Sequence, residues 1–302
     1  MIAALTTMPE MKAILVTGAS GQLGRSLKAI ISDYPQYVVT FVNRDVLDLS
    51  NPLRVANFFI ENTFDIIINC AAYTAVDKAE SEPELANMIN HLAVKQLADI
   101  AVEQQAKLIH ISTDYVFNGQ QHRPYIETDE VDPQGVYGKT KLAGEQAVFQ
   151  AMPTNALIIR TSWVYSEFGN NFVKTMLRLG AERESLSVVY DQIGAPTYAR
   201  DLARGIMTIV GSYQFKQEDI NSELYHYSNE GVCSWYDFAK AVFEQSNINC
   251  EVLPIETNGY PTPAKRPHYC VLNKTKIKDN FCMKVPYWLD GLKQMAAVKI
   301  HM

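Results

Sequence analysis

Two side chains with acid–base chemistry, Tyr137 and Lys141, stand four positions apart in the chain. On a helix this spacing places both side chains on one face, about one turn apart. The phenol of a tyrosine is a weak acid, and a neighbouring ammonium group favours the phenolate and lowers the phenol pKa toward neutrality. Such a group can protonate a carbonyl oxygen while the carbonyl carbon receives a hydride. Because a Tyr-x-x-x-Lys pair also arises by chance, this interpretation depends on the segments around it.

A glycine-rich segment near the N-terminus predicts a binding site for dinucleotide phosphates. Residues 13–17 read A-I-L-V-T, an apolar run typical of a buried parallel strand. The chain then passes through Gly18, Gly21 and Gly24, spaced Gly-x-x-Gly-x-x-Gly, into a helical stretch that ends near Ile31. The first glycine allows a tight turn, the second a close approach to the pyrophosphate, and the third close packing of helix and strand. An ordinary glycine turn is the alternative.

The end of the next predicted strand, residues 38–42, carries the side chains that would distinguish the two nicotinamide nucleotides. This position lies about twenty residues beyond the glycine turn, where the adenine ribose is contacted. Asn43, Arg44 and Asp45 stand there. An acidic residue at the strand end would favour NAD, whereas Arg44 can pair with a 2′-phosphate. We therefore expect NADPH, with NADH also usable. The alternative role for Arg44 is a solvated loop cation.

Strands and helices alternate through the first half of the chain, which predicts an α/β fold with a doubly wound parallel sheet of Rossmann type. Further strands are expected at 66–73, 107–112 and 157–160, and helices at 52–62, 84–104 and 137–150. Beyond Ser166 the pattern loosens. Helices are expected there at 171–180, 201–211, 235–245 and 287–297, with polar loops at 74–80 and 191–197 and a sixth strand at 224–228 that returns to the sheet. Asn90 falls inside a predicted helix, where its side chain either makes a specific hydrogen bond or lies on the surface.

This pattern predicts two parts. Residues 11–165, with about 200–228, would form an NAD(P)-binding Rossmann domain, and residues 166–199 and 229–302 a smaller C-terminal substrate-binding region. Residues 1–10 would be a short, loosely ordered extension, because they lack the charged start and the apolar stretch of a signal peptide.

Composition excludes several classes of function. The net charge of −6 argues against a nucleic-acid partner. The 5 cysteines contain no Cys-x-x-Cys pair, so we expect reduced thiols in the cytoplasm and neither a zinc site nor a disulfide framework. No apolar run reaches about 18 residues, so we expect no membrane span.

The carboxyl ends of the central strands are predicted to line the site. The strand at 66–73 ends in small side chains, which leave room for a ligand in the crevice of the sheet. Thr113 follows the strand at 107–112, where its hydroxyl could hydrogen-bond a substrate carbonyl. A hydroxyl that closes a turn is the alternative.

Six segments together make the chain resemble the dTDP-4-dehydrorhamnose reductase family of extended short-chain dehydrogenases/reductases. These segments are residues 18–24, 69–80, 112–117 (S-T-D-Y-V-F), 137–141, 160–165 and 191–197 (D-Q-I-G-A-P-T). The likeness runs from about residue 12 to Asn273. Segments 112–117 and 191–197 are the specific ones, whereas the glycine turn marks only the superfamily.

The resemblance implies NAD(P)H-dependent reduction of the C4 ketone of dTDP-4-dehydro-β-L-rhamnose, a step of dTDP-rhamnose and cell-surface polysaccharide biosynthesis. Tyr137 would be the general acid, Lys141 would lower its pKa and hold the nicotinamide ribose, and Thr113 would polarise the ketone. The implied cofactor contacts are Gly18, Gly21, Gln22, Leu23, Gly24, Asn43, Arg44, Asp48, Leu49, Ala71, Ala72, Tyr73, Tyr137 and Lys141. The implied contacts to the nucleotide sugar are Thr74, Val76, Thr113, Asp114, Trp163, Gln192, Thr197 and Arg266.

Arg266 and Trp163 need separate comment, and so does the metal. Arg266 is expected to meet the nucleotide diphosphate, because its fork of donors suits phosphate, and Trp163 could instead be a core aromatic. Some family members dimerise around magnesium held by glutamates. Ser26 stands at one matching position and lacks a carboxylate, so we expect no metal site and leave a homodimer open.

Two further functions are compatible with the same segments. The chain is also similar to the non-catalytic regulatory subunit of methionine adenosyltransferase, which acts through a partner. A reductase of another nucleotide-linked keto sugar would need the same glycine turn and Tyr-Lys pair, since fold and cofactor do not specify the substrate.

Overall fold

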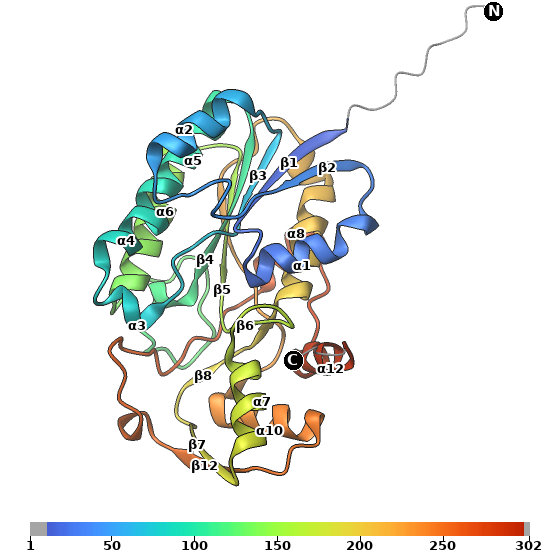
Figure 1. Cartoon of the computed structure of the whole chain (residues 1–302). Coiled ribbons are helices and arrows are strands. Elements are labelled where there is room, and N and C mark those ends of the chain that lie inside the picture. The colour runs from blue at the N-terminus through green and yellow to red at the C-terminus, as the bar shows by residue number, and fades with distance from the viewer. Residues whose placement is uncertain (1–10, 299–302) are drawn as a thin grey trace, which may run out of the picture.

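A parallel sheet of six strands forms the centre of the protein in the computed structural model, which describes residues 11–298 (Figure 1). The prediction for residues 1–10 lies outside this range. The strand order is β10-β5-β4-β3-β1-β2. The bounds are β1 Lys12–Thr17, β2 Tyr37–Phe41, β3 Ile66–Asn69, β4 Lys107–Thr113, β5 Ala156–Thr161 and β10 Glu223–His226. The pairing of β10 with β5 confirms the predicted sixth strand.

Helices cover both faces of this sheet because side chains alternate between the faces along each buried strand. Ile14 and Val16 face a cluster that includes α1 (Gln22–Ile30), α8 (Ala199–Gly211) and α11 (Thr275–Phe281). Leu15 faces a cluster that includes α2 (Pro52–Glu61), α5 (Ala93–Glu103) and α6 (Val136–Ala151). This arrangement confirms the doubly wound Rossmann-type fold.

A smaller part packs beyond the carboxyl ends of the strands and has a core of its own (Figure 1). Its elements are α7 Phe172–Glu182, β7 Ser185–Val189, α10 Trp235–Ser246, β12 Glu251–Ile255 and α12 Trp288–Ala297. β7 and β12 pair in parallel. Two short pairs connect it to the sheet region, namely β6 (Val164–Tyr165) with β9 (Thr197–Tyr198), and β8 (Ile193–Gly194) with β11 (Cys233–Ser234). The short helix α9 spans Tyr213–Lys216.

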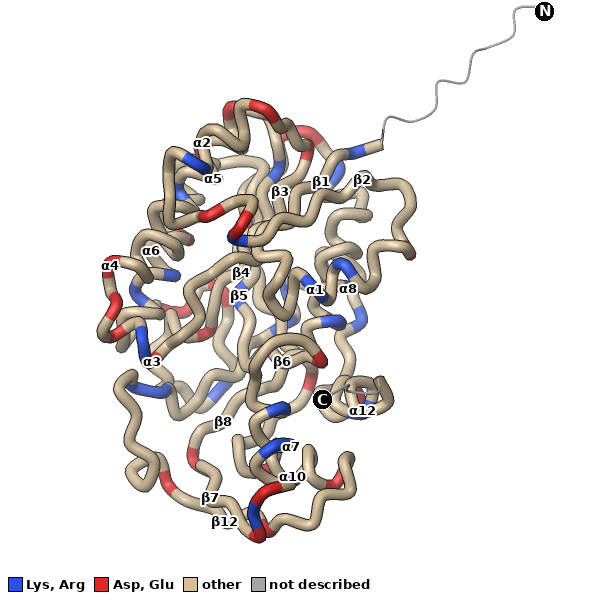
Figure 2. The backbone as a smooth tube through the Cα atoms, viewed as in Figure 1, with Lys and Arg blue, Asp and Glu red and all other residues tan. Residues whose placement is uncertain are grey.

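Acidic and basic residues are interspersed over both parts (Figure 2). None of the helices within residues 11–298 is long and apolar enough to cross a membrane.

Three predicted boundaries differ from the structure. The strand expected at 66–73 ends at Asn69, and the loop expected at 74–80 contains the helix α3 (Val76–Ala79). The helix expected at 84–104 is α4 (Pro83–Asn87) and α5 joined by one turn of π-helix (Met88–Leu92). Asn90 is buried, and its amide pairs with the backbone N–H and C=O of Tyr73. The surface alternative for Asn90 is therefore wrong.

Helix α6 packs closely against the π turn at Gly144, and this contact gives a prediction. A Cβ at Gly144 would lie 2.2 Å from the carbonyl oxygen of Asn90. We expect Gly144→Ala to lower the free energy of unfolding by about 1–3 kcal/mol, as overpacking does, although alanine normally favours a helix. Urea unfolding measures this. Gly211→Ala is the matched control, because nothing lies within 4 Å of that position in α8. Equal effects of the two substitutions would contradict the prediction.

Candidate active site

A cavity of about 790 Å³ opens at the carboxyl ends of the central strands. It extends from the glycine turn to the loops that lead into the smaller part. Most residues predicted as site residues line it, namely Gly18, Gly21, Gln22, Leu23, Arg44, Asp48, Leu49, Ala71, Ala72, Tyr73, Thr74, Val76, Thr113, Asp114, Tyr137, Lys141 and Trp163. The structure therefore brings together segments that are far apart in sequence at the edge where α/β sheets bind ligands.

The glycine turn is shaped for a phosphate group. Gly18 has a φ of +64°, and a Cβ there would lie 2.7 Å from the backbone nitrogen of Ala71. Gly24 lies behind the turn, where a Cβ would be 2.4 Å from the carbonyl oxygen of Gly18. Gly21 is the N-cap residue of α1 and provides no side-chain cap. The N–H groups of the first turn, which have no partner within a helix, are therefore not capped by a side chain. Such a helix start binds anions, and the residues present fit a dinucleotide.

Tyr137 and Thr113 form the polar centre of the cavity. Thr113 ends β4, where its hydroxyl donates to Asp114 Oδ1 at 3.0 Å and accepts from the N–H of Tyr115 at 3.2 Å. Tyr137 lines the same stretch of the cavity, and the neighbouring Thr113 side chain favours the phenolate form of Tyr137. Burial raises the pKa of Asp114 to about 6. A carbonyl oxygen placed between the two hydroxyls would accept from Tyr137, and it would also accept from Thr113 when the single Thr113 proton turns from Asp114 toward it.

The predicted effect of Lys141 on Tyr137 is wrong for this arrangement. Burial raises the pKa of Tyr137 to about 12, the neighbouring Thr113 side chain offsets this in part, and the charge of Asp114 adds to the rise. Lys141 is itself buried, and its Nζ donates to the carbonyl oxygen of Ile111 at 2.6 Å. Burial lowers the pKa of Lys141 to about 8, against the pull of the Glu145 charge. For both groups, the cost of burying the charged form outweighs the effect of a neighbouring charge that the four-residue spacing predicted.

Arg44 and Asp48 lie at the other end of the cavity. Arg44 is exposed, and its Nε is 3.5 Å from Asp48 Oδ1. Asp48 also accepts from the hydroxyl and the backbone N–H of Ser50, and the Ser50 hydroxyl holds the pKa of Asp48 below its usual value. Asn43 does not line the cavity, and its amide nitrogen donates to Asp45 at 3.1 Å.

Four residues predicted for the sugar side occupy different environments. Trp163 lines the cavity at a φ of 48° and stacks on Trp235, with ring centroids 3.5 Å apart. The other three do not line it. Thr197 is buried against Thr161, Gln192 donates to Thr257, and Arg266 pairs with Asp77 at 2.7 Å. Arg266 keeps one buried guanidinium nitrogen, Nη1, without a partner.

The sequence interpretation missed several residues of the cavity wall. They are Ser20, Leu47, Ser50, Cys70, Ala75, Ile89, Ile111, Ser112, Tyr115, Thr161, Ser162, Val164, Gly169, Asn170, Asn171 and Leu202. Thr161 ends β5 and Ser162 follows it, so the rule that pointed to Thr113 could have found them. Nothing in the sequence marks Asn170 and Asn171, whose loop is held by Gln22. The Gln22 side chain donates to the carbonyl of Val164 and accepts from Ser166 and Asn171.

Ser26 stands at the position that matches a metal-binding glutamate. It is buried, and its hydroxyl donates to the carbonyl of Gln22 at 2.9 Å. Across residues 11–298, no three His, Cys, Asp or Glu side chains are grouped so that they could hold a metal ion.

The fold and the site define a Rossmann-type reductase of the extended short-chain dehydrogenase/reductase class. A family model described as the RmlD substrate binding domain matches residues 11–300. The dTDP-4-dehydrorhamnose reductase of Escherichia coli K12 is 44% identical over 291 residues, which cover 93% of this chain and 96% of that protein. The chain belongs to the dTDP-4-dehydrorhamnose reductase family.

Solved structures agree with this membership. A dTDP-4-dehydrorhamnose reductase from Clostridium acetobutylicum superposes with a TM-score of 0.88 at 41% identity, covering 95% of this chain and 99% of that one. The reductase from Bacillus anthracis, solved in complex with NADP, gives a TM-score of 0.88 at 40% identity, covering 94% of this chain and 98% of that one.

Proposed function

We propose that the protein reduces the C4 ketone of dTDP-4-dehydro-β-L-rhamnose to an alcohol, giving dTDP-β-L-rhamnose, with NADPH as reductant and NADH also usable. One observation carries the proposal. Thr113 and Tyr137 line the same cavity as a glycine turn that fits a dinucleotide. Membership of the family supports the choice of substrate, and the NADP complex of the Bacillus anthracis relative supports the choice of cofactor.

The chain's own residues would bind the cofactor along the cavity. The first turn of α1 would hold the pyrophosphate, Arg44 the 2′-phosphate, and Lys141 the ribose next to the nicotinamide. When bound, the cofactor supplies a hydride for the carbonyl carbon. The remaining chemistry is one proton transfer, and the protein provides it.

Tyr137 would give its proton to the ketone oxygen. With a pKa raised to about 12, its phenol is fully protonated at neutral pH, as a donor for reduction must be. Thr113 would hydrogen-bond the same oxygen, which stabilises the negative charge that develops there as the hydride arrives. Tyr137 would therefore act as a buried, neutral acid, and not as an acid whose pKa is lowered by a lysine.

The nucleotide sugar would enter the cavity from the side that faces the smaller part. Trp163 would cover one face of the sugar, with Thr74, Val76 and Asp114 around its hydroxyls. Arg266, which has an unpartnered nitrogen beside its pair with Asp77, would reach the diphosphate. Gln192 and Thr197 would support this wall from behind.

The direct test follows NADPH oxidation with enzymatically prepared dTDP-4-dehydrorhamnose. Turnover that yields dTDP-rhamnose supports the proposal. No turnover in protein that still binds NADPH would overturn it. Two results would then point elsewhere, namely turnover of a different nucleotide-linked keto sugar, or capture of a methionine adenosyltransferase in stoichiometric amount.

Arg44 gives a prediction about cofactor choice. We expect Arg44→Ala to lower the preference for NADPH over NADH, measured as the ratio of kcat/KM values, by about 10- to 100-fold, since one charge-assisted hydrogen bond contributes about 1.5–3 kcal/mol. The value for NADH itself should change little. Arg54→Ala is the control, because Arg54 lies on α2 and does not line the cavity. An unchanged ratio would remove Arg44 from the phosphate site.

A further inference from the structure

A chain of four buried polar side chains runs beneath the active site, from the glycine turn to Lys141. Thr17, Asn69 and His110 come from the neighbouring strands β1, β3 and β4, and Lys141 comes from α6. Each side chain is at most 1% exposed. Thr17 Oγ1 lies 2.7 Å from Asn69 Oδ1, Asn69 Nδ2 lies 3.0 Å from His110 Nδ1, and His110 Nε2 lies 3.3 Å from Lys141 Nζ.

The orientation of the Asn69 amide is fixed by a backbone group. The backbone N–H of Ala71 points at Asn69 Oδ1 from 3.2 Å. A backbone N–H can only donate, so the atom facing it must be the amide oxygen. The amide nitrogen then faces His110 and donates to it.

This orientation fixes the tautomer of His110. Because His110 Nδ1 accepts from Asn69, a neutral ring carries its proton on Nε2. Burial, followed by the charge of Lys141, lowers the pKa of His110 well below its ordinary value, so the ring does not take a second proton near neutral pH. The Nε2–H group therefore points at Lys141 Nζ.

An N–H donor directed at a lysine disfavours the ammonium form. An ammonium group has three donors and no acceptor, whereas a neutral amine has one lone pair that can accept from Nε2–H. Three other groups face or adjoin Lys141. The Ile111 carbonyl accepts from Nζ, the Glu145 carboxylate favours the ammonium form, and the neutral phenol of Tyr137 lies one turn earlier on α6. The hydrogen-bond partners of Nζ are the Ile111 carbonyl, which accepts, and the His110 ring, whose Nε2–H is a donor.

We infer that His110 is a positioning residue that presents its Nε2–H to Lys141 and so sets the pH at which Lys141 loses its proton. The relay runs from the Ala71 backbone through Asn69 and His110 to the amine. Its consequence for turnover rests on the proposed function, but the tautomer of His110 is a property of the protein alone. The two can therefore be tested separately.

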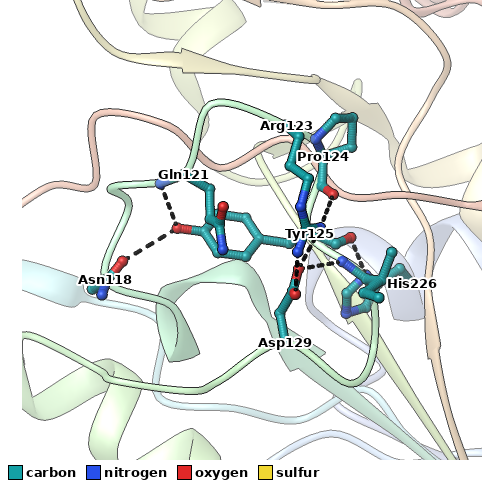
Figure 3. A network of polar contacts seen from close by, with 8 residues as sticks. Asn118, Gln121, Arg123, Pro124, Tyr125, Asp129 and His226 are labelled. Carbon is teal, nitrogen blue, oxygen red and sulfur yellow. Dashed lines mark hydrogen bonds and ion pairs between the residues drawn. The ribbon is translucent and has the colours of Figure 1, made fainter.

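The first test is NMR of the ring nitrogens in protein with ¹⁵N-labelled histidine. We expect His110 to be protonated at Nε2, unprotonated at Nδ1, and unchanged between pH 5 and 8. His226 is the internal control, because its Nδ1 lies 3.1 Å from the carbonyl oxygen of Tyr125 and must donate to it (Figure 3). His226 should show the opposite tautomer. A His110 ring that is protonated at Nδ1, or that titrates in this range, would overturn the inference, and the measurement needs neither substrate nor cofactor.

The second test compares two variants of His110 by the pH dependence of kcat. His110→Phe removes both ring nitrogens, so Lys141 should keep its proton longer and the alkaline limb should move to higher pH by about 1 pH unit. His110→Gln keeps an N–H near Lys141 and should move the limb less. A general loss of activity without a shift would indicate a purely structural role. Equal profiles for wild type and both variants would also contradict the inference.

Discussion

Replacing Tyr137 by phenylalanine is expected to lower kcat by about 10²–10⁴-fold, the usual contribution of a positioned general acid. The substitution removes one hydroxyl and keeps the ring that packs edge-on against Tyr115, with centroids 5.5 Å apart. The cavity should therefore keep its shape, and NADPH should bind with nearly the wild-type Kd. The measurements are NADPH oxidation for kcat and titration of the variant with NADPH for binding.

The matched control is Tyr115→Phe, which removes a hydroxyl from the other ring of the same pair. We expect a much smaller effect on kcat, because Tyr115 has no place in the proton transfer. Turnover of Tyr137→Phe within a few-fold of wild type would exclude Tyr137 as the acid. Equal losses in both variants would indicate that the ring pair, and not the proton of Tyr137, matters.

Features that depend on neighbouring residues could be predicted from the sequence. The strand, glycine turn and helix at 13–31 are local, because a tight turn needs glycine at Gly18 and the helix start follows directly. The position of Thr113 at a strand end followed from the rule that parallel strands meet their ligands at one edge. Identifying the family then added Trp163, which no local pattern marks.

Features that depend on distant contacts could not be predicted in this way. The pKa of Tyr137 is set by burial under several segments, so its direction was missed although the Tyr-Lys spacing was correct. The inward turn at Asn90 depends on its bonds to Tyr73, seventeen positions away. The partner of Arg266 is Asp77, 189 positions away, and no periodicity connects these two loops.

A buried ion pair behind the active site is expected to have the largest effect on stability. Arg160 on β5 meets Glu145 on α6 through two hydrogen bonds, from Nε at 2.9 Å and from Nη2 at 2.6 Å. Both side chains are at most 4% exposed. The carboxylate also accepts from Ser112, whose residue lines the cavity, and the guanidinium lies 5.0 Å from the ring of Phe117. The pair therefore fixes α6, which carries Tyr137 and Lys141, against the sheet.

We expect Arg160→Met to lower the free energy of unfolding by about 3–5 kcal/mol, because it leaves the Glu145 carboxylate buried without its counter-ion. The double variant Arg160→Met/Glu145→Gln should recover much of this loss, since it removes both charges while the new side-chain amide can still accept from Ser112. Urea unfolding of wild type, the two single variants and the double variant gives the coupling energy directly. A cost of Arg160→Met below about 1 kcal/mol, the value typical of a surface pair, would contradict this prediction. The pair would then not be what holds α6 in place.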